Sequence, residues 1–151
     1  LEALRHHLIT TGGMPAEVAK RIDLTALVRF FATDLGQLLR AKPQQVQREV
    51  PFSMLLPANQ LFEALQNDPG EDVLVHGIMD GYVTEADGVT LFDYKTDHEP
   101  DPAKLVARYR GQLNLYAQAL AQLQPKPVTH RYLVLLRTGT IVDLVAESTG
   151  K

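Results

Sequence analysis

The chain of 151 residues is long enough to bury the core of one domain, and its 45% of hydrophobic residues exclude an intrinsically disordered protein. The absence of cysteine excludes a disulfide framework and is compatible with the cytosol, so we expect a cytoplasmic protein. A net charge of −3 argues against a free-standing nucleic-acid binder, whose surface is usually strongly basic.

The sequence carries no apolar run long enough to span a membrane and no signal-peptide pattern, so we expect no membrane association. It opens with LEALRHHL, inside a helical pattern and without a starting methionine. We therefore expect a piece of a longer protein.

Residues 1–42 carry the periodicity of amphipathic helices. Asp23 is placed to cap one of these helices. The apolar stripe of that helix is expected to belong to the core and consists of Leu24, Leu27, Val28, Phe31 and Leu35. His6 and His7 are adjacent, so their side chains point about 100° apart on a helix and are not expected to share a metal ion.

A strand is predicted over residues 45–56, where side chains alternate between two faces. One face would carry Val46, Arg48, Val50 and Phe52, and the other Gln47, Glu49 and Pro51. A short helix or loop insertion is expected over residues 57–66, followed by a turn at 67–70.

The stretch 73–96 predicts two strands joined by an Asp-Gly dipeptide at 87–88, which readily takes positive φ and favours a tight hairpin. Asp80 lies in the first strand. Asp93 and Lys95 lie in the second and, being two residues apart, point to the same face. A two-residue loop would place Asp80 opposite Lys95, and a four-residue loop would place it opposite Asp93. Both registers put two carboxylates and one ammonium group on one face.

Neighbouring carboxylates repel each other unless a cation lies between them, and a hard divalent metal, usually Mg²⁺, suits such oxygen ligands. The alternative is that Asp80 and Asp93 lie on a solvated face, with Lys95 as a surface ion-pair partner. The surrounding residues weigh against that alternative, because they are apolar and predict central strands covered on both faces. They are Val73, Leu74, Val75, Ile78, Met79, Leu91, Phe92 and Tyr94.

Residues 98–102 predict a loop, and Asp101 is placed to cap a helix over 102–123. The buried arc of this helix would consist of Leu105, Tyr109, Leu113, Tyr116 and Leu120. Two further strands, over 128–136 and 141–145, would complete the sheet.

Gln112 lies at the edge of this buried arc, one helical turn from Tyr116. Arg108 and Lys104 lie just beyond it on the same side. Gln112 is either a boundary residue or a functional one, and Tyr116 is either a core residue or a functional one.

The chain contains GIMDGY, LFDYKT and QLNLY in this order, and the run resembles the RecB-type nucleases of the PD-(D/E)XK superfamily. The resemblance is to the C-terminal nuclease domain of helicase–nuclease subunits of the AddA (RexA) type. It covers most of the chain and implies an α/β fold, with a restriction-endonuclease-like core whose mixed β-sheet is flanked by helices. We accordingly expect one nuclease domain over 1–151, with an N-terminal helical part at about 1–42 and a nuclease core at about 45–151.

The resemblance implies Mg²⁺-dependent hydrolysis of DNA, within a bacterial complex that processes double-strand breaks for recombinational repair. Asp80, Asp93 and the backbone carbonyl of Tyr94 would hold the metal, which Mn²⁺ or Ca²⁺ can replace in binding. Lys95 would orient the attacking water or neutralise charge in the transition state. Gln112 would position DNA or the catalytic residues.

Four more residues have secondary roles in this interpretation. Tyr116 completes the Gln-x-x-x-Tyr pattern of the family. Glu49, in a Glu-x-Pro-Phe setting, would either approach the metal or cap the edge of the sheet. Arg108 and Lys104 are candidate contacts for DNA. The upstream metal-binding histidine of the family has no match here, so we expect the isolated chain to cleave DNA poorly or not at all.

The implied partners are DNA, helicase domains of the same longer chain, and a second subunit of the AddB (RexB) type. ATP would bind only in the helicase part, since no GxxxxGK[ST] loop occurs here. The iron–sulfur cluster that some RecB-type nucleases carry is not expected without cysteine. The negative net charge is compatible with a nuclease to which a neighbouring motor delivers the DNA.

Two other functions are weighed against a DNA nuclease by the residues that each would require. One is a degenerate nuclease fold that serves only as a DNA-binding or structural module, and the intact set of Asp80, Asp93 and Lys95 argues against it. The other is a carboxylate-pair enzyme such as a glycosidase, which needs two carboxyl groups flanking an open sugar cleft and no adjacent lysine.

Overall fold

The computed structural model describes residues 2–62, 70–97, 99 and 101–145. Its helices and strands are, in chain order, α1 (Glu2–Thr10), α2 (Ala16–Arg21), α3 (Leu24–Ala32), α4 (Asp34–Ala41), η1 (Pro43–Gln45), β1 (Val46–Pro57), α5 (Ala58–Leu61), β2 (Asp72–Thr84), β3 (Val89–Lys95), α6 (Pro102–Leu123), β4 (Val128–Leu135) and β5 (Thr140–Asp143). The turn expected at 67–70 lies largely outside the described residues.

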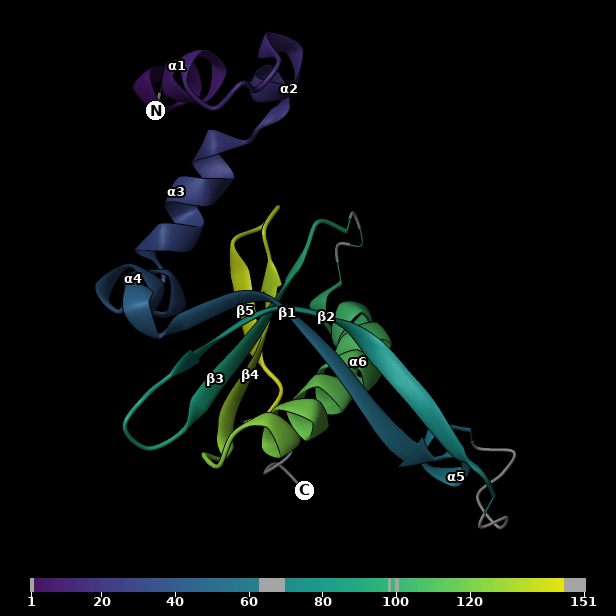
Figure 1. Cartoon of the computed structure of the whole chain (residues 1–151). Coiled ribbons are helices and arrows are strands. Elements are labelled where there is room, and N and C mark those ends of the chain that lie inside the picture. Colours follow the sequence, from purple (N-terminus) through teal and green to yellow (C-terminus); the bar gives the residue numbers. More distant parts are fainter. Residues whose placement is uncertain (1, 63–69, 98, 100, 146–151) are drawn as a thin grey trace.

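The described strands form one sheet in the order β1-β2-β3-β4-β5. β3 and β4 run parallel and the other neighbours run antiparallel, so the sheet is mixed. Parallel neighbours need a long crossover connection, and α6 provides it between β3 and β4. α6 packs on one face of the sheet, while α3 and α4 pack on the other (Figure 1). The predicted α/β class, with a mixed sheet flanked by helices, is confirmed.

β3 lies between these two apolar layers. Leu91 belongs to the cluster on the α6 side, Phe92 belongs to the cluster on the side of α3 and α4, and neither side chain is exposed. A strand covered on both faces is apolar at consecutive positions, as β3 is before Asp93. Asp93 therefore follows directly on a fully buried segment, which holds its backbone in place.

β2 differs from the prediction of a strand covered on both faces. It pairs with β3 only over Gly81–Thr84, and its first part pairs with β1 alone. Leu74 and Ile78 of β2, and Leu55 of β1, are each about 60% exposed. The prediction is wrong for this part of β2 because only one face of the two-stranded ribbon packs against α6.

The hairpin between β2 and β3 has a four-residue loop, because Thr84 pairs with Val89 and the Glu85 N–H donates to the Gly88 carbonyl at 2.8 Å. Neither residue at 87–88 has positive φ, so the expected tight turn is wrong. Glycine is required here for another reason. A Cβ atom on Gly88 would lie 2.8 Å from the carbonyl oxygen of Pro127, the residue before β4.

The predicted helix after Asp23 is shorter than its apolar stripe suggests. Asp23 accepts the Ala26 N–H at 2.9 Å and caps α3 as expected, but Thr33 then caps a new helix, α4. The direction of the chain changes there, so Val28 is 50% exposed and Phe31 37% exposed. They do not belong to the core. Together with neighbours they line an open apolar cavity of about 530 Å³ formed by Leu4, Leu24, Leu27, Val28, Phe31, Ala32 and Arg40.

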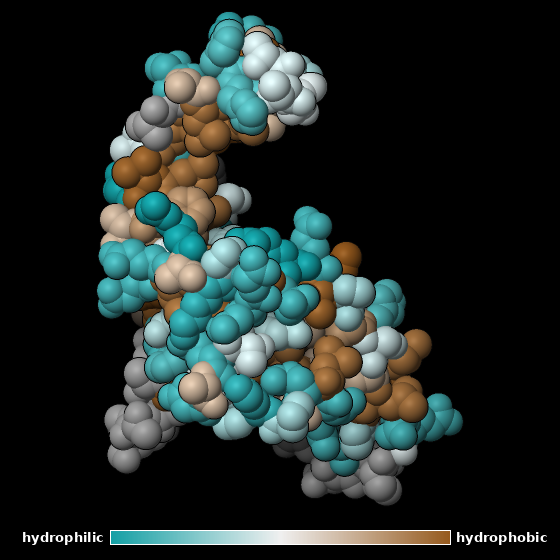
Figure 2. Space-filling model, turned by 60° about the vertical axis from the view of Figure 1, so that its left-hand side comes forward, coloured by the Kyte–Doolittle hydropathy of each residue, from teal (hydrophilic) through white to brown (hydrophobic). Residues whose placement is uncertain are grey.

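Figure 2 shows this apolar surface as a brown band between the N-terminal helices and the body of the protein. The side chains buried from α3 and α4 are instead Leu24, Ala26, Phe30, Leu35 and Leu39. Within the described residues, none of the helices has the length and apolar character that a membrane crossing requires.

The alternation of β1 is interrupted at Glu49, whose φ is +51°. Val46 packs in the cluster on the side of α3 and α4, whereas Phe52 packs against α6. The expectation that both share one face is therefore wrong, because a left-handed residue breaks the two-residue period of a strand.

α6 has the predicted bounds. Asp101 caps it through the Ala103 N–H at 2.9 Å, and Pro102 occupies the first turn. Within the predicted arc, Leu105, Leu113, Tyr116 and Leu120 are buried, and Tyr109 is partly buried. α6 therefore turns one apolar face to the sheet and places Gln112 at the edge of that face.

Candidate active site

The candidate site lies where β2 and β3 separate. Their last pair is Gly81 with Phe92, beyond which β2 continues beside β1 alone. Figure 1 shows the β1–β2 ribbon running away from β3 at this point. Asp80 is the first residue after the separation, and its Oδ2 accepts the backbone N–H of Tyr94 at 2.7 Å. A side-chain carboxylate thus holds the two strands together where their backbone pairing stops.

The four-residue loop decides between the two registers that the sequence leaves open. Continuing the β2–β3 ladder by one position places Asp80 level with Asp93, not with Lys95. The two carboxylates therefore face each other across the point of separation, and Lys95 lies two residues further along β3.

Asp93 is an acid in an apolar environment, with only 2% of its surface exposed. Burial raises its pKa above the usual range, against the opposing effect of Lys95, and the negative charge of Asp80 raises it further. Lys95 Nζ lies 2.7 Å from Asp93 Oδ2. The ammonium group supplies the opposite charge, and no further hydrogen-bond partner of Oδ2 is found among the described residues. A buried carboxylate oxygen in such a position is suited to a cation.

The ammonium group of Lys95 is held from three directions. Besides Asp93, it donates to Gln112 Oε1 at 3.0 Å and lies 4.3 Å from the centroid of the Tyr109 ring. The Lys95 side chain is only 16% exposed. The head of a long flexible side chain is therefore fixed beside the carboxylate pair.

Gln112 and Tyr116 extend this network along α6. Gln112 Nε2 donates to the Tyr116 hydroxyl at 2.7 Å, and that hydroxyl donates to the carbonyl of Ile78 at 3.2 Å. Tyr116 is also a core residue in edge contact with Phe52, and burial raises its hydroxyl pKa. The sequence left open whether Tyr116 is a core residue or a member of the site. In the structure it packs in the core and also links α6 to β2, the strand that carries Asp80.

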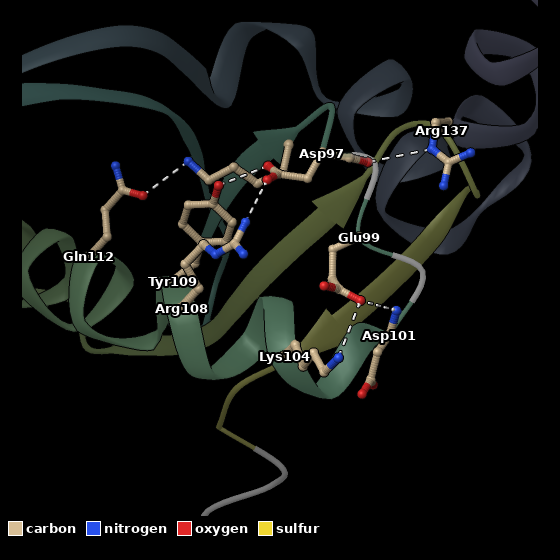
Figure 3. Close-up of polar contacts among 9 residues, drawn as sticks. Asp97, Glu99, Asp101, Lys104, Arg108, Tyr109, Gln112 and Arg137 are labelled. Carbon is tan, nitrogen blue, oxygen red and sulfur yellow. Dashed lines mark hydrogen bonds and ion pairs between the residues drawn. The ribbon is translucent and has the colours of Figure 1, made fainter.

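Arg108 and Lys104 are engaged with acids (Figure 3). Arg108 Nη1 pairs with Asp97 Oδ1 at 2.9 Å, and Lys104 Nζ lies 3.9 Å from Glu99 Oε1. Both side chains are more than half exposed. Their role as contacts for DNA stays a prediction.

Two neighbours of Lys95 are missed by the sequence interpretation. Tyr109 is expected only as a core residue, and Asp97 is assigned no role. Asp97 accepts the hydroxyl of Tyr109 at 2.8 Å in addition to Arg108 (Figure 3). Their spacing in the sequence could have indicated this association. Asp97 lies two residues after Lys95, and Tyr109 lies one helical turn before Gln112.

Glu49 lies level with Asp80 on the neighbouring strand, since the β1–β2 ladder is regular on either side of it. Its side chain is exposed, and its backbone has the left-handed φ of +51° noted above. Such strain is often found beside functional sites. Whether Glu49 approaches a metal stays a prediction.

The backbone strain at Glu49 leads to a stability prediction. Valine normally suits a strand, but a β-branched residue is disfavoured in the left-handed region. We therefore expect Glu49→Val to lower the free energy of unfolding by about 1–2 kcal/mol. Gln47→Val, at an exposed position of the same strand, is the control and should be neutral or stabilising. Equal denaturation midpoints for the two variants would contradict the assigned strain.

The raised pKa of Asp93 leads to a prediction with a defined sign. A carboxyl group whose folded-state pKa lies above its unfolded value favours folding below the unfolded pKa, and this contribution is lost as the pH rises through the folded pKa. At neutral pH the buried charge therefore destabilises the fold. Asp93→Asn should raise the melting temperature at pH 7 by about 2–4 °C, corresponding to about 1 kcal/mol, and the gain should shrink as the pH falls through the raised folded-state pKa of Asp93 towards its unfolded value.

Thermal unfolding of the chain across pH measures this effect. Asp87→Asn, in the exposed hairpin loop, is the control and should change little at any pH. A lower melting temperature for Asp93→Asn at pH 7 would mean that the ion pair with Lys95 outweighs the burial of the carboxylate.

The residues at this site fit a hard divalent cation. Asp80 and Asp93 supply carboxylate oxygens from two strands, and Asp93 Oδ2 is buried beside the ammonium group of Lys95. The Tyr94 side chain lies on the opposite face, in edge contact with Phe30, so its contribution would be its backbone carbonyl. In the described ranges, no group of three or more His, Cys, Asp or Glu side chains is arranged to hold a metal ion. Divalent cations of this kind commonly keep water among their ligands.

Comparison with known proteins agrees with this geometry. The chain is 74% identical over all 151 residues to an ATP-dependent helicase/nuclease subunit from Lacticaseibacillus paracasei, and equally to the one from Lacticaseibacillus casei, and it spans 12% of the length of each. It is 48% identical over 141 residues to the protein of the same name from Levilactobacillus brevis, covering 89% of this chain and 11% of that protein. The sequence model of the PD-(D/E)XK nuclease superfamily matches residues 3–147. This match covers nearly the whole chain, including Asp80, Asp93 and Lys95, and the chain therefore belongs to the PD-(D/E)XK nuclease superfamily.

Proposed function

We propose that the chain is a Mg²⁺-dependent DNA nuclease domain that hydrolyses phosphodiester bonds. The observation that supports this most directly is the facing pair Asp80 and Asp93, with the ammonium group of Lys95 fixed 2.7 Å from Asp93. Two carboxylates and a lysine at the point where two strands part provide oxygen ligands for a cation and a positive charge beside them.

In this proposal Asp80, Asp93 and the carbonyl of Tyr94 hold Mg²⁺, for which Mn²⁺ or Ca²⁺ can substitute in binding. A bound divalent ion supplies Lewis-acid stabilisation and a lower pKa for water. Because the two carboxylates lie on different strands, the contacts that hold β2 and β3 together also set the distance between the metal ligands. Asp80 has both roles: it would bind the metal, and it accepts the Tyr94 N–H that joins the two strands.

Lys95 serves the charge that develops during hydrolysis. Water loses a proton as its oxygen bonds to phosphorus. One ester P–O bond breaks, negative charge grows on the phosphoryl oxygens and the leaving oxygen, and the leaving oxygen then takes up a proton from solvent. The ammonium group is held in a largely buried position, where such a charge is stabilised more strongly than in water. Gln112 accepts one of its N–H groups and so keeps it directed into the site.

We further propose that the domain, residues 1–151, works within a longer helicase–nuclease of the kind named in its relatives. ATP would drive the helicase part, a second subunit of the AddB type would complete the complex, and the substrate would be the DNA of a double-strand break during recombinational repair in the cytoplasm. The net charge of −3 supports this arrangement, because such a domain gains little affinity for DNA from counterion release alone.

The test is cleavage of linear double-stranded DNA by the full-length helicase–nuclease, with Mg²⁺ varied and ATP present. Cleavage should require the divalent ion and should be lost in Asp93→Ala, while the ATPase activity persists. Gln118→Ala, on the exposed side of α6, is the control and should cleave normally. Equal cleavage by Asp93→Ala would refute the proposed site and favour a degenerate nuclease fold with a structural or DNA-binding role.

A further inference from the structure

Tyr109 forms a bridge between Lys95 and Asp97. It lies on α6, one turn before Gln112, and its ring centroid is 4.3 Å from Lys95 Nζ. Its hydroxyl donates to Asp97 Oδ2 at 2.8 Å. The ring face therefore contacts the ammonium group of the site while the far end of the same side chain is fixed by an acid.

Asp97 is itself held in place by contacts from two directions (Figure 3). Its Oδ1 accepts Arg108 Nη1 at 2.9 Å, and its backbone carbonyl accepts Arg137 Nε at 3.4 Å. Each carboxylate oxygen thus has one donor, and the charge of Asp97 is balanced by Arg108. Asp97 can fix the hydroxyl of Tyr109 without drawing Lys95 out of the site.

We propose that Tyr109 and Asp97 are positioning residues that hold the ammonium group of Lys95 in its working place. This inference rests on the proposed function, because it assigns the bridge to the lysine that would serve DNA hydrolysis. Neither residue touches the reacting atoms. Tyr109 acts through Lys95, and Asp97 acts through Tyr109.

The chemistry of the three contacts to Lys95 supports this role. A lysine head carries three N–H groups on a flexible stem, so one or two partners leave it free to rotate away. Asp93 and Gln112 are two of its partners, and the ring of Tyr109 is the third. An aromatic face attracts a cation without cancelling its charge, as a third carboxylate would. The positive charge of Lys95 stays available for the substrate.

Tyr109 also packs beside the core cluster between α6 and β4, and packing alone is the rival explanation. The two explanations differ in what the side chain must supply. Packing requires volume, which leucine or a fluorinated ring provides. Positioning of Lys95 requires the negative face of an aromatic ring, which leucine lacks and fluorination weakens.

The experiment measures kcat and KM for Mg²⁺-dependent DNA cleavage by the full-length helicase–nuclease. Tyr109→Leu should lower kcat about tenfold with little change in KM, the effect of losing one cation–π contact to a largely buried ammonium group. Tyr109→Phe keeps the ring but loses the hydroxyl that Asp97 holds, so it should recover only part of that loss. Asp97→Ala should lose about as much as Tyr109→Phe, because in both variants the ring remains but is no longer fixed. Gln118→Ala is the matched control on the same helix.

Two further measurements separate positioning from packing. Increasingly fluorinated phenylalanines at position 109 keep nearly the same shape, so kcat should fall step by step with fluorination. In a Lys95→Ala background, Tyr109→Leu should have no further effect, because a residue that acts through Lys95 has nothing left to position.

An unchanged kcat across the fluorinated series, or losses from Lys95→Ala and Tyr109→Leu that multiply, would overturn the inference. The fluorinated series also decides the matter if Tyr109→Leu does not fold. Cleavage that depends on Lys95 but not on Tyr109 refutes this inference alone. A protein that does not cleave DNA, or cleaves equally well without Lys95, refutes the proposed function.

Discussion

Replacing Lys95 with alanine in the full-length helicase–nuclease should lower DNA cleavage by about 10²–10³-fold, the loss typical of removing one group that stabilises charge in a transition state. ATP-driven unwinding should be unchanged. The ammonium group lies 2.7 Å from Asp93 and 3.0 Å from Gln112, and the Lys95 side chain is only 16% exposed. A water molecule that fills its place in the variant would stabilise the developing negative charge less strongly than the ammonium group does. The loss should appear in kcat, since the lysine is directed at charge that exists only in the transition state.

Lys95→Ala leaves Asp93 buried without its cation, so loss of structure must be separated from loss of chemistry. Resistance to limited proteolysis in the presence of Mg²⁺ reports whether the nuclease domain remains folded. Lys20→Ala, at an exposed ion pair on α2, is the control and should affect neither activity. If unwinding fails together with cleavage, Lys95 has a structural role, and the proposed part in catalysis is wrong.

The elements of the fold could be predicted where local signals agree with tertiary packing. α6 is the clearest case, because Asp101 and Pro102 fix its start and an apolar arc sets its buried face. The segment before Asp93 is apolar at consecutive positions, and the structure covers it on both faces. A similar apolar run in β2 gave a wrong prediction, because sequence alone does not show that β2 separates from β3 after four pairs.

The site could be predicted only in part, for geometric reasons. The two-residue period places Asp93 and Lys95 on one face under either register, so their association needs no knowledge of the loop. The length of that loop depends on contacts from elsewhere, such as the close approach of Gly88 to the start of β4. Tyr109 was missed because its helical position suits a core residue equally well, and its contact with Lys95 exists only after α6 packs on the sheet.

Asp80→Asn should abolish metal binding at the site and lower DNA cleavage by about 10²–10³-fold, which corresponds to the several kcal/mol that a bound cation supplies to a transition state. The fold should persist, because the amide oxygen of asparagine can still accept the Tyr94 N–H that Asp80 Oδ2 accepts at 2.7 Å. The variant thus removes the negative charge and keeps the link between β2 and β3.

Asp80→Ala removes both the charge and the link. It should therefore lose the same activity as Asp80→Asn and be less stable than that variant by about 1–3 kcal/mol, since the N–H of Tyr94 is left without its acceptor. Calorimetric titration with Mg²⁺, Mn²⁺ or Ca²⁺, together with thermal unfolding, separates the two effects. Asp72→Asn, at the exposed start of the same strand, is the control for the loss of one negative charge. Metal binding in Asp80→Asn equal to that of the unaltered protein would show that Asp80 only joins the strands, and Asp93 alone would then remain as a carboxylate ligand.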